Sequence, residues 1–338
     1  MKHRVLVVGT GSIGERHVRC MLNTERAAVG ICELDDGVRR SVAERYGVSE
    51  SFAGLDTAMN VRWDAAVVAT PADTHVTIAQ RLADAAVNLL IEKPLSTTTE
   101  GIAALMETVK RRGLVAAVAY VYRAHPVLAA MRRALRSGRF GRPVQVVANC
   151  GQHFPTYRPA YRQIYYARRE RGGGAVQDAL THIVNACEWL VGPVDRLSAD
   201  AAHQVLEGVD VEDTVHVIAR HGDVPACYSL NQHQAPLELT ITVVCDKGTV
   251  RFELHASRWR WMSEPGGAWR DEAAPPMERD EWFAIQENAF LDCLEHKAEP
   301  LCTLAEAFQT LKVNLAALQS ADGGAAPLTL DRNAGPET

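Results

Sequence analysis

Long apolar runs are missing from this sequence. No segment reaches the roughly 18 uninterrupted apolar residues that a transmembrane helix requires. Residues 1–8 combine a basic start with an apolar run, but that run is too short for a signal peptide and meets glycine at once. We therefore expect a soluble protein without a membrane partner.

Cysteine motifs are missing as well. The 8 cysteines are scattered and include neither a C-x-x-C pair nor the spacing of a metal-binding finger. A chain of 338 residues is also far larger than the small secreted domains that disulfides hold together. We interpret these residues as reduced thiols of a cytoplasmic protein, and we predict no metal site.

A surplus of positive charge is the third absence. Lysine and arginine number 36 against 41 aspartate and glutamate residues, which leaves a formal net charge of -5. Such a chain has no general attraction for nucleic acid or for an anionic membrane surface. Any binding of an anion must therefore be local, and we expect no nucleic-acid partner.

Strands and helices alternate over the first third of the chain. Residues 5–8 form an aliphatic run that is typical of a strand buried on both faces of a parallel sheet. A glycine turn and a helical stretch over residues 13–22 follow. The alternation continues with expected strands at 28–32, 65–69, 89–91 and 115–120 and expected helices at 38–46, 74–86 and 99–112. This order predicts a doubly wound α/β sheet of the Rossmann type.

The pattern changes after about residue 122. Segments 215–218, 239–244 and 250–254 are typical of antiparallel strands joined by turns. Another strand is expected at 144–149, and further helices are expected at 126–137, 175–191, 281–293 and 304–318. We predict a dinucleotide-binding domain over 1–122, an α+β domain with an open, mainly antiparallel sheet over 123–320, and a loose tail over 321–338.

A glycine-rich turn connects the first strand to the first helix. Gly9, Gly11 and Gly14 match G-x-G-x-x-G, and Ser12 and Ile13 lie between the last two glycines. Two of the glycines let the backbone turn and approach a pyrophosphate, and the third permits close packing of the helix on the strand. In this position the motif predicts dinucleotide binding.

The acidic residue Glu33 ends the second expected strand, about 20 residues after the glycine turn. A carboxylate at this place accepts a hydrogen bond from the ribose 2′-hydroxyl and repels a 2′-phosphate. This favours NAD, while the nearby Arg39 and Arg40 leave NADP open as an alternative. A solvated acid in a turn is the structural alternative for Glu33.

Further motifs follow in a fixed order along the chain. They are Ala69-Thr70-Pro71, His75, Glu92-Lys93-Pro94, and the glycines 172–174 that lead into Asp178 and His182. Together with the glycine turn they closely resemble the Gfo/Idh/MocA family of oxidoreductases, named for glucose-fructose oxidoreductase and inositol dehydrogenase. The likeness covers nearly the whole chain.

The resemblance implies a Rossmann domain followed by an α+β domain whose open sheet often mediates dimers or tetramers. It implies that Lys93 lies near the nicotinamide and the substrate hydroxyl, and that Asp178 and His182 face them from the second domain. The residues implied to line the cofactor cleft are Thr70, Pro71, His75 and Glu92. We therefore expect a homodimer or homotetramer that assembles through the C-terminal sheet.

The chemistry of alcohol oxidation suits these residue types. Asp178 and His182 are four apart on an expected helix, so they lie on one face. We assign His182 as acid/base, Asp178 as the group that orients it or contacts substrate, and Lys93 as the stabiliser of a developing alkoxide. Whether Lys93 or His182 takes the proton is left open. The structural alternatives are a solvated lysine at a strand end for Lys93 and an ordinary pair on a helix surface for Asp178 and His182. Pro94 predicts a cis bond after Lys93.

Tyrosine and arginine are concentrated in residues 157–171. This composition suits stacking on a base or sugar and the binding of a phosphate or carboxylate, but an exposed basic loop or a subunit interface fits equally well. Other candidates for substrate contact also suit structural hydrogen bonding. The candidates are Tyr122, Arg123, Gln152, His153, Tyr157, Arg158, Asn231 and His233.

The sequence thus favours an NAD(P)-dependent dehydrogenase or reductase that transfers hydride to or from a hydroxyl-bearing carbon of a sugar, sugar derivative or cyclitol. Two alternatives stay open. One is a redox-neutral glycosidase that uses bound NAD transiently, and the other is a nonenzymatic regulator that binds a dinucleotide.

Overall fold

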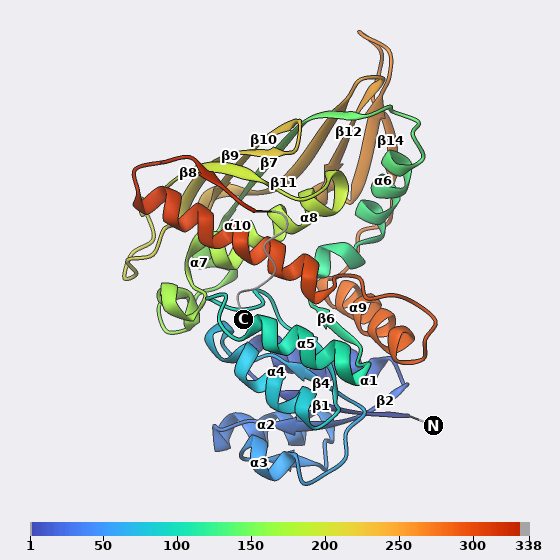
Figure 1. Cartoon of the computed structure of the whole chain (residues 1–338), viewed down its shortest axis with the longest axis vertical. Helices are drawn as coiled ribbons and strands as arrows, with labels where there is room; N and C mark the ends of the chain where they lie inside the picture. The colour runs from blue at the N-terminus through green and yellow to red at the C-terminus, as the bar shows by residue number, and fades with distance from the viewer. Residues whose placement is uncertain (1, 332–338) are drawn as a thin grey trace. The chain divides into compact units, whose positions relative to one another are not determined.

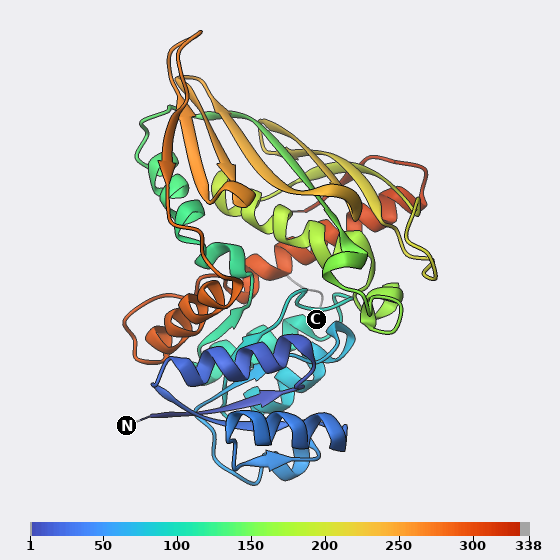
Figure 2. The same ribbon diagram turned by 180° about the vertical axis from the view of Figure 1, so that it is seen from behind.

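The computed structural model describes residues 2–331, which divide into two compact units. The first unit comprises residues 2–124 and 278–308, and the second comprises residues 125–277 and 309–331. Figures 1 and 2 show the chain from opposite sides. The division expected from sequence placed all of 123–320 in one domain, whereas in the structure the chain returns to the first unit before it ends.

A six-stranded, all-parallel sheet forms the centre of the first unit, in the order β3-β2-β1-β4-β5-β6. Its strands are β1 (His3–Val8), β2 (Ala27–Cys32), β3 (Ser51–Phe52), β4 (Ala65–Val68), β5 (Asn88–Ile91) and β6 (Ala116–Val118). Val5, Leu6 and Val7 are fully buried because helices cover both faces of the sheet. The predicted doubly wound sheet is confirmed.

Helices connect the parallel strands of this unit. They are α1 (Ser12–Asn23), α2 (Asp36–Tyr46), α3 (Leu55–Ala58), α4 (His75–Asp84) and α5 (Ile102–Arg112). Figure 1 shows α4 and α5 in front of the sheet, and α1 lies in front in the opposite view of Figure 2. The short elements β3 and α3 lie where the sequence predicted neither strand nor helix.

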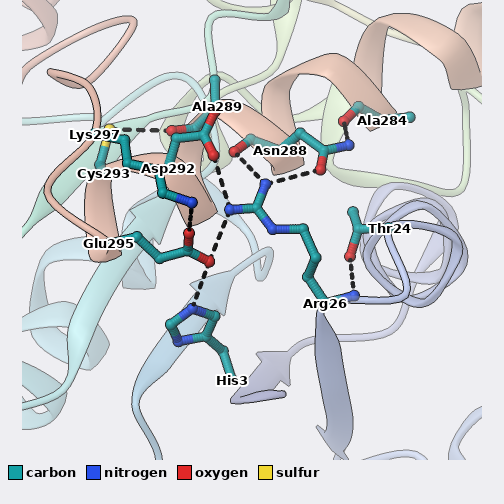
Figure 3. A network of polar contacts seen from close by, with 10 residues as sticks. All are labelled: His3, Thr24, Arg26, Ala284, Asn288, Ala289, Asp292, Cys293, Glu295 and Lys297. Atoms are coloured by element: carbon teal, nitrogen blue, oxygen red, sulfur yellow. Dashed lines mark hydrogen bonds and ion pairs between the residues drawn. The ribbon is translucent and has the colours of Figure 1, made fainter. Parts of the chain in front are cut away.

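Helix α9 (Arg279–Leu294) completes the first unit from far along the sequence. Phe290 and Leu291 pack into the core that holds Val5 and Val18. Beside this apolar contact, the Arg26 guanidinium donates to Asp292 and Glu295 over 2.8 Å each, and Glu295 also contacts His3 (Figure 3). Helix α10 (Leu304–Asp322) begins in the first unit and continues into the second.

The second unit is built on a nine-stranded sheet in the order β14-β13-β12-β11-β7-β10-β9-β8-β15. All neighbouring strands are antiparallel except β10 and β7. The strands are β7 (Pro143–His153), β8 (Arg196–Ala202), β9 (Thr214–His221), β10 (Val224–Asn231), β11 (His233–Cys245), β12 (Gly248–Glu253), β13 (Arg258–Met262), β14 (Arg270–Ala273) and β15 (Leu328–Thr329). The predicted open, mainly antiparallel sheet is confirmed.

Helices of the second unit cover one face of this sheet. They are α6 (Pro126–Arg136), α7 (Phe154–Tyr157), α8 (Thr181–Val191) and the later part of α10. Side chains alternate along β9, where Val215 and Val217 are buried and His216 and Ile218 are exposed. Within residues 2–331, the helices lie on one side of this sheet and none covers the other face (Figures 1 and 2).

The predicted loose tail over 321–338 is wrong for its first part. Helix α10 continues to Asp322, β15 pairs with β8, and the Ser198 hydroxyl donates to the carbonyl of Ala325 over 2.5 Å. The reason is the unpaired edge of β8, which accepts a further strand. Residues 332–338 lie outside the described part of the chain. Within residues 2–331, no helix has the length and apolarity needed to span a membrane.

Leu291→Ala should destabilise the first unit, because Leu291 is fully buried in the core of a sheet that begins at residue 3. We expect a loss of about 2–5 kcal/mol in the free energy of unfolding, measured by urea denaturation. Ile285→Ala is the matched control on the same helix, since Ile285 is 38% exposed, and should stay within about 0.5 kcal/mol. Equal effects of the two variants would contradict the assignment of α9 to this core.

Candidate functional site

At two positions of the glycine turn after β1 the backbone geometry favours glycine. Gly9 has φ +84, a conformation that favours glycine, and a Cβ on Gly14 would lie 1.9 Å from the carbonyl oxygen of Gly9. Gly11 differs, since nothing lies within 4 Å of the position its Cβ would occupy. Two glycines therefore serve the fold, and the open space beside Gly11 suits close approach of a pyrophosphate.

Helix α1 starts directly at this turn, with Gly11 as its N-cap and no side chain capping it. The amides of the first helical turn have no partner within a helix, so Ser12, Ile13 and Gly14 offer donors to an anion. A side-chain cap would compete for these amides. The local geometry therefore fits a phosphate at the helix N-terminus.

Glu33 lies at the end of β2 and is bonded to the glycine turn. Its Oε2 accepts from the backbone N–H of Thr10 over 2.8 Å, and its Oε1 accepts from the N–H of Asp35 over 3.0 Å. Arg39 donates to the Glu33 carbonyl and pairs with Asp36. The carboxylate is thus held beside the turn, and its remaining lone pairs can accept from ribose hydroxyls.

The turn after β4 is fastened to the turn after β5 by a buried histidine. His75 is 1% exposed, and its Nδ1 and Nε2 lie 3.0 Å and 2.7 Å from the carbonyl oxygens of Pro94 and Thr70. Thr70 also shares a hydrogen bond with Thr74, and Pro71 precedes the short helical turn Ala72–Thr74. His75 therefore shapes these turns from inside the unit.

The segment Glu92-Lys93-Pro94 follows β5 directly. The Lys93–Pro94 peptide bond is cis, so the sequence-based hypothesis is confirmed. The backbone N–H of Lys93 donates to Oε2 of Glu92 over 2.9 Å. Oε1 of Glu92 accepts from Nε2 of the buried His17 over 2.8 Å, and Nδ1 of His17 lies 2.5 Å from Glu287 on α9.

The glycines of the second unit shape the turn before α8. A Cβ on Gly173 would lie 2.2 Å from the carbonyl oxygen of Tyr166, and one on Gly174 would lie 2.4 Å from the Glu212 carboxylate. Glu212 is buried, accepts from the N–H of Val176 over 3.1 Å and contacts Arg169 at 3.5 Å. Burial raises the pKa of Glu212, and these bonds oppose the shift.

Asp178 lies on a π-helical turn (Val176–Leu180), and His182 lies in the first turn of α8. The sequence predicted one regular helix over 175–191, but the N-terminal part is wider than an α-helix. Such π-turns inside helices are frequent at functional sites. The Tyr165 hydroxyl donates to Oδ1 of Asp178 over 2.6 Å, which brings the Tyr/Arg-rich segment 157–171 onto this turn.

Several candidates for substrate contact form hydrogen bonds within their own unit. Arg123 is 3% exposed and donates to Glu306 over 2.6 Å and to the carbonyl of Leu301 over 2.9 Å. Gln152 donates to Gln232, and Asn231 bonds Gln234 and the backbone of the β10–β11 turn. The three residues therefore form structural hydrogen bonds, and their contact with a substrate stays a prediction.

The remaining candidates are more accessible. Tyr157 is 49% exposed, and Arg158 is partly exposed in the same segment. His153 is exposed and contacts the Thr156 hydroxyl, while His233 contacts Thr214. Tyr122 packs edge-on to Trp282. Within residues 2–331, no three His, Cys, Asp or Glu side chains are grouped so that they could hold a metal ion.

Sequence reasoning missed four residues of these sites. His17 is three positions after the last motif glycine, and a histidine on an otherwise apolar helix face is the signal that was available. Glu287 and Glu212 carry no local signal, because each is one acid among many in its segment. Tyr165 lies inside the segment noted for substrate contact, yet nothing in the spacing singled it out.

The six-stranded order and the glycine turn define the first unit as a dinucleotide-binding Rossmann fold. Residues 3–120 match the family description "Oxidoreductase family, NAD-binding Rossmann fold", and residues 128–251 match "GFO/IDH/MocA C-terminal domain". The chain belongs to the GFO/IDH/MocA family of oxidoreductases. Residues 3–120 form the NAD-binding domain of that family.

Relatives of known name resemble nearly the whole chain. A D-apiose dehydrogenase of Paraburkholderia graminis is 25% identical over 94% of this chain and 87% of its own length. The structure of the WlbA dehydrogenase from Bordetella pertussis with NADH and UDP-GlcNAcA matches with a TM-score of 0.84 at 25% identity, over 98% of this chain and 99% of that one. The structure of a levoglucosan dehydrogenase in complex with NADH matches with a TM-score of 0.89 over 98% of this chain and 100% of that one. At 18% identity this match supports the fold alone.

Gly11→Ala and Gly14→Ala should separate binding from folding. At Gly11 the new methyl group meets only the space proposed for a pyrophosphate. We expect NADH affinity to fall about tenfold or more, with the free energy of unfolding within about 0.5 kcal/mol of wild type. At Gly14 it meets the Gly9 carbonyl, so stability should fall by about 1–3 kcal/mol. Calorimetric titration with NADH and urea denaturation measure the two effects; a Gly11→Ala protein with wild-type affinity would contradict this geometry.

Proposed function

We propose that this protein uses NAD to oxidise a secondary alcohol carbon of a sugar, sugar derivative or cyclitol, or runs the reverse reduction. The observation that carries the proposal is the arrangement at the carboxyl ends of β1, β2 and β5. There the first unit presents the open Gly11 turn, the Glu33 carboxylate and Lys93. Ligands of open α/β sheets bind at this edge.

The residues at this edge fit NAD. The amides of Ser12 and Ile13 would hold the pyrophosphate, and Glu33 would accept from the ribose hydroxyls. The fixed carboxylate disfavours a 2′-phosphate, and this supports NAD over NADP. A relative named D-xylose 1-dehydrogenase (NADP(+)) keeps NADP as the alternative cofactor. When bound, NAD supplies the nicotinamide ring that exchanges hydride with the alcohol carbon.

Three side chains are assigned to the chemistry. Lys93 stabilises the negative charge that develops on the substrate oxygen, and His182 exchanges the hydroxyl proton. Asp178 orients substrate or His182, and its bond from Tyr165 supports a fixed carboxylate. Variants of Lys93 and His182 are needed to decide which of the two side chains accepts the proton first. Sugar-like substrates are supported by the relatives named for apiose and inositol.

We also propose a cytoplasmic homodimer or homotetramer that forms through the helix-free face of the nine-stranded sheet. Ile218 supports the interface, since this β-branched side chain in a long strand is 72% exposed. The cytoplasm is supported by the cysteines, all of which carry free thiols in the structure.

Lys93→Ala and His182→Ala should each lower kcat about a hundredfold or more, because each removes a charge or proton carrier from the reacting oxygen. Turnover is followed at the nicotinamide absorbance band across cyclitols, hexoses, sugar acids and nucleotide sugars. Lys110→Ala on the exposed side of α5 is the control and should keep wild-type turnover. Full turnover in both active-site variants with an accepted substrate would refute the assignment. Release of an aglycone without net NADH would favour the redox-neutral glycosidase instead.

Ile218→Glu should dissociate the oligomer, since it places a charge on the sheet face that forms the proposed interface. The molar mass measured by light scattering after gel filtration should fall to that of one chain. Val205→Glu, at a side chain that is 54% exposed in a loop of the same unit, should leave the mass unchanged. A wild-type protein that is already monomeric would overturn the proposal.

A further inference from the structure

Three ionisable side chains meet in the interior of the first unit. His17 and Glu287 are 0% exposed and Glu92 is 4% exposed. His17 comes from α1, Glu92 follows β5, and Glu287 comes from α9. We call these three residues the His17 triad. The triad joins the helix of the cofactor turn, the strand end that carries Lys93, and the C-terminal segment that returns to this unit.

The contacts of the triad suit a charged imidazole. Nδ1 of His17 lies 2.5 Å from Oε1 of Glu287, and Nε2 lies 2.8 Å from Oε1 of Glu92. A neutral imidazole has one N–H and can donate to one of these oxygens, whereas an imidazolium donates to both. The edge of the ring also packs on Phe283, which excludes water from that side.

Electrostatics favour the same protonation state. Burial by itself lowers the pKa of His17, but the charge and hydrogen bond of Glu287, with those of Glu92, raise it to about 10. Burial raises the pKa of Glu92, while the bond and charge of His17 and the charge of Lys93 lower it overall. Burial raises the pKa of Glu287 against the opposing charge of His17.

Other charged groups near the triad are paired with one another. Asp280 on α9 forms ion pairs with Arg16 and Arg19 on α1. Burial, together with the charges of Asp280 and Glu287, raises the pKa of the Cys20 thiol to about 12, so this group stays neutral. The charge balance around His17 therefore depends on its two carboxylate partners.

Stability alone does not account for a buried triad of this kind. Removing charges from water costs about as much as their attraction returns, and apolar side chains of similar volume often stabilise an interior better. The geometry shows another consequence. Glu92 uses one carboxylate oxygen to bind His17 and the other to accept the backbone N–H of Lys93. Its orientation therefore sets the position of the Lys93 backbone.

We propose that His17 and Glu287 are positioning residues for Lys93, acting through the carboxylate of Glu92. His75 holds the next residue of the same turn, through the carbonyl of Pro94. The turn that carries Lys93 is thus fastened from two sides by buried histidines. The proposal rests on the proposed role of Lys93, and it explains why α9 is linked through His17 to the turn that carries Lys93.

The test compares Glu287→Gln and His17→Gln with Glu295→Gln. Glu295 follows the same α9 helix and binds Arg26 and His3 in the separate network of Figure 3, so its substitution removes a carboxylate without touching Glu92. For the two triad variants we expect kcat to fall about 10-fold to 100-fold with KM for NAD within about twofold of wild type. Glu295→Gln should keep kcat.

The pH profile of Glu287→Gln distinguishes positioning from a general loss of structure. Without the Glu287 charge the pKa of His17 falls, so His17 loses its proton and its second hydrogen bond as pH rises through the lowered value. We expect kcat of this variant to decline with rising pH in a range where wild type does not. The imidazole nitrogen shifts of His17, read by NMR, should move over the same range.

Hydrogen exchange at the Lys93 amide tests the inference without a substrate. It should be faster in both triad variants and unchanged in Glu295→Gln, while amides of β1 exchange as in wild type. Folded triad variants with wild-type Lys93 exchange, or equal losses in all three variants, would overturn the inference. If wild type turns over no sugar, the proposed function is refuted and this inference is not. The exchange result would still show whether the triad positions the Lys93 backbone.

Discussion

The first unit depends on a backbone contact that only glycine permits. Gly14 packs against the carbonyl of Gly9 with no room for a side chain, and this contact sets the angle at which α1 leaves the sheet. His17 lies one turn further along that helix and is hydrogen-bonded to Glu92 at the end of β5. Gly11, in the same turn, leaves space for a phosphate. The close contact between Gly9 and Gly14 therefore positions both the turn proposed to bind the cofactor and His17, which binds Glu92 next to Lys93.

The second unit uses the same device around a carboxylate. Gly173 and Gly174 let the chain pass beside backbone carbonyls and the buried Glu212, which in turn binds the amide that begins the π-helical turn. Asp178 projects from that turn, and Tyr165 reaches it from a segment bound to Glu212 through Arg169. In both units a buried acid accepts a hydrogen bond from a backbone N–H in the turn that carries a residue of the proposed chemistry.

The discontinuity of the first unit has a physical basis in its core. The sheet contributes Val5 and Val7 to a core cluster that also includes Val18 of α1. Helix α9 supplies Phe290 and Leu291 to that core and brings Glu287 with them. The segment that completes the apolar core thereby also completes the charged triad. Packing and the proposed positioning of Lys93 are consequences of the same docking.

The sequence by itself determined what local patterns encode. The glycine turn, the aliphatic strand of residues 5–8, the alternation of strands and helices, and the motifs around Lys93 and Asp178 all lie within short windows, so period and spacing identify them. They sufficed for the Rossmann sheet, the open second sheet and the family. The Lys93-Pro94 motif also predicted the cis peptide bond that the structure contains.

Only the tertiary structure decided which distant segments meet. Nothing near residues 278–308 indicates that they join the first unit, and no spacing pairs His17 with Glu287 across 270 positions. The parallel pairing of β7 with β10 and the π-turn at Asp178 depend equally on neighbours far along the chain. Burial and charge pairing act between surfaces that exist only after folding, and a local pattern carries no record of them.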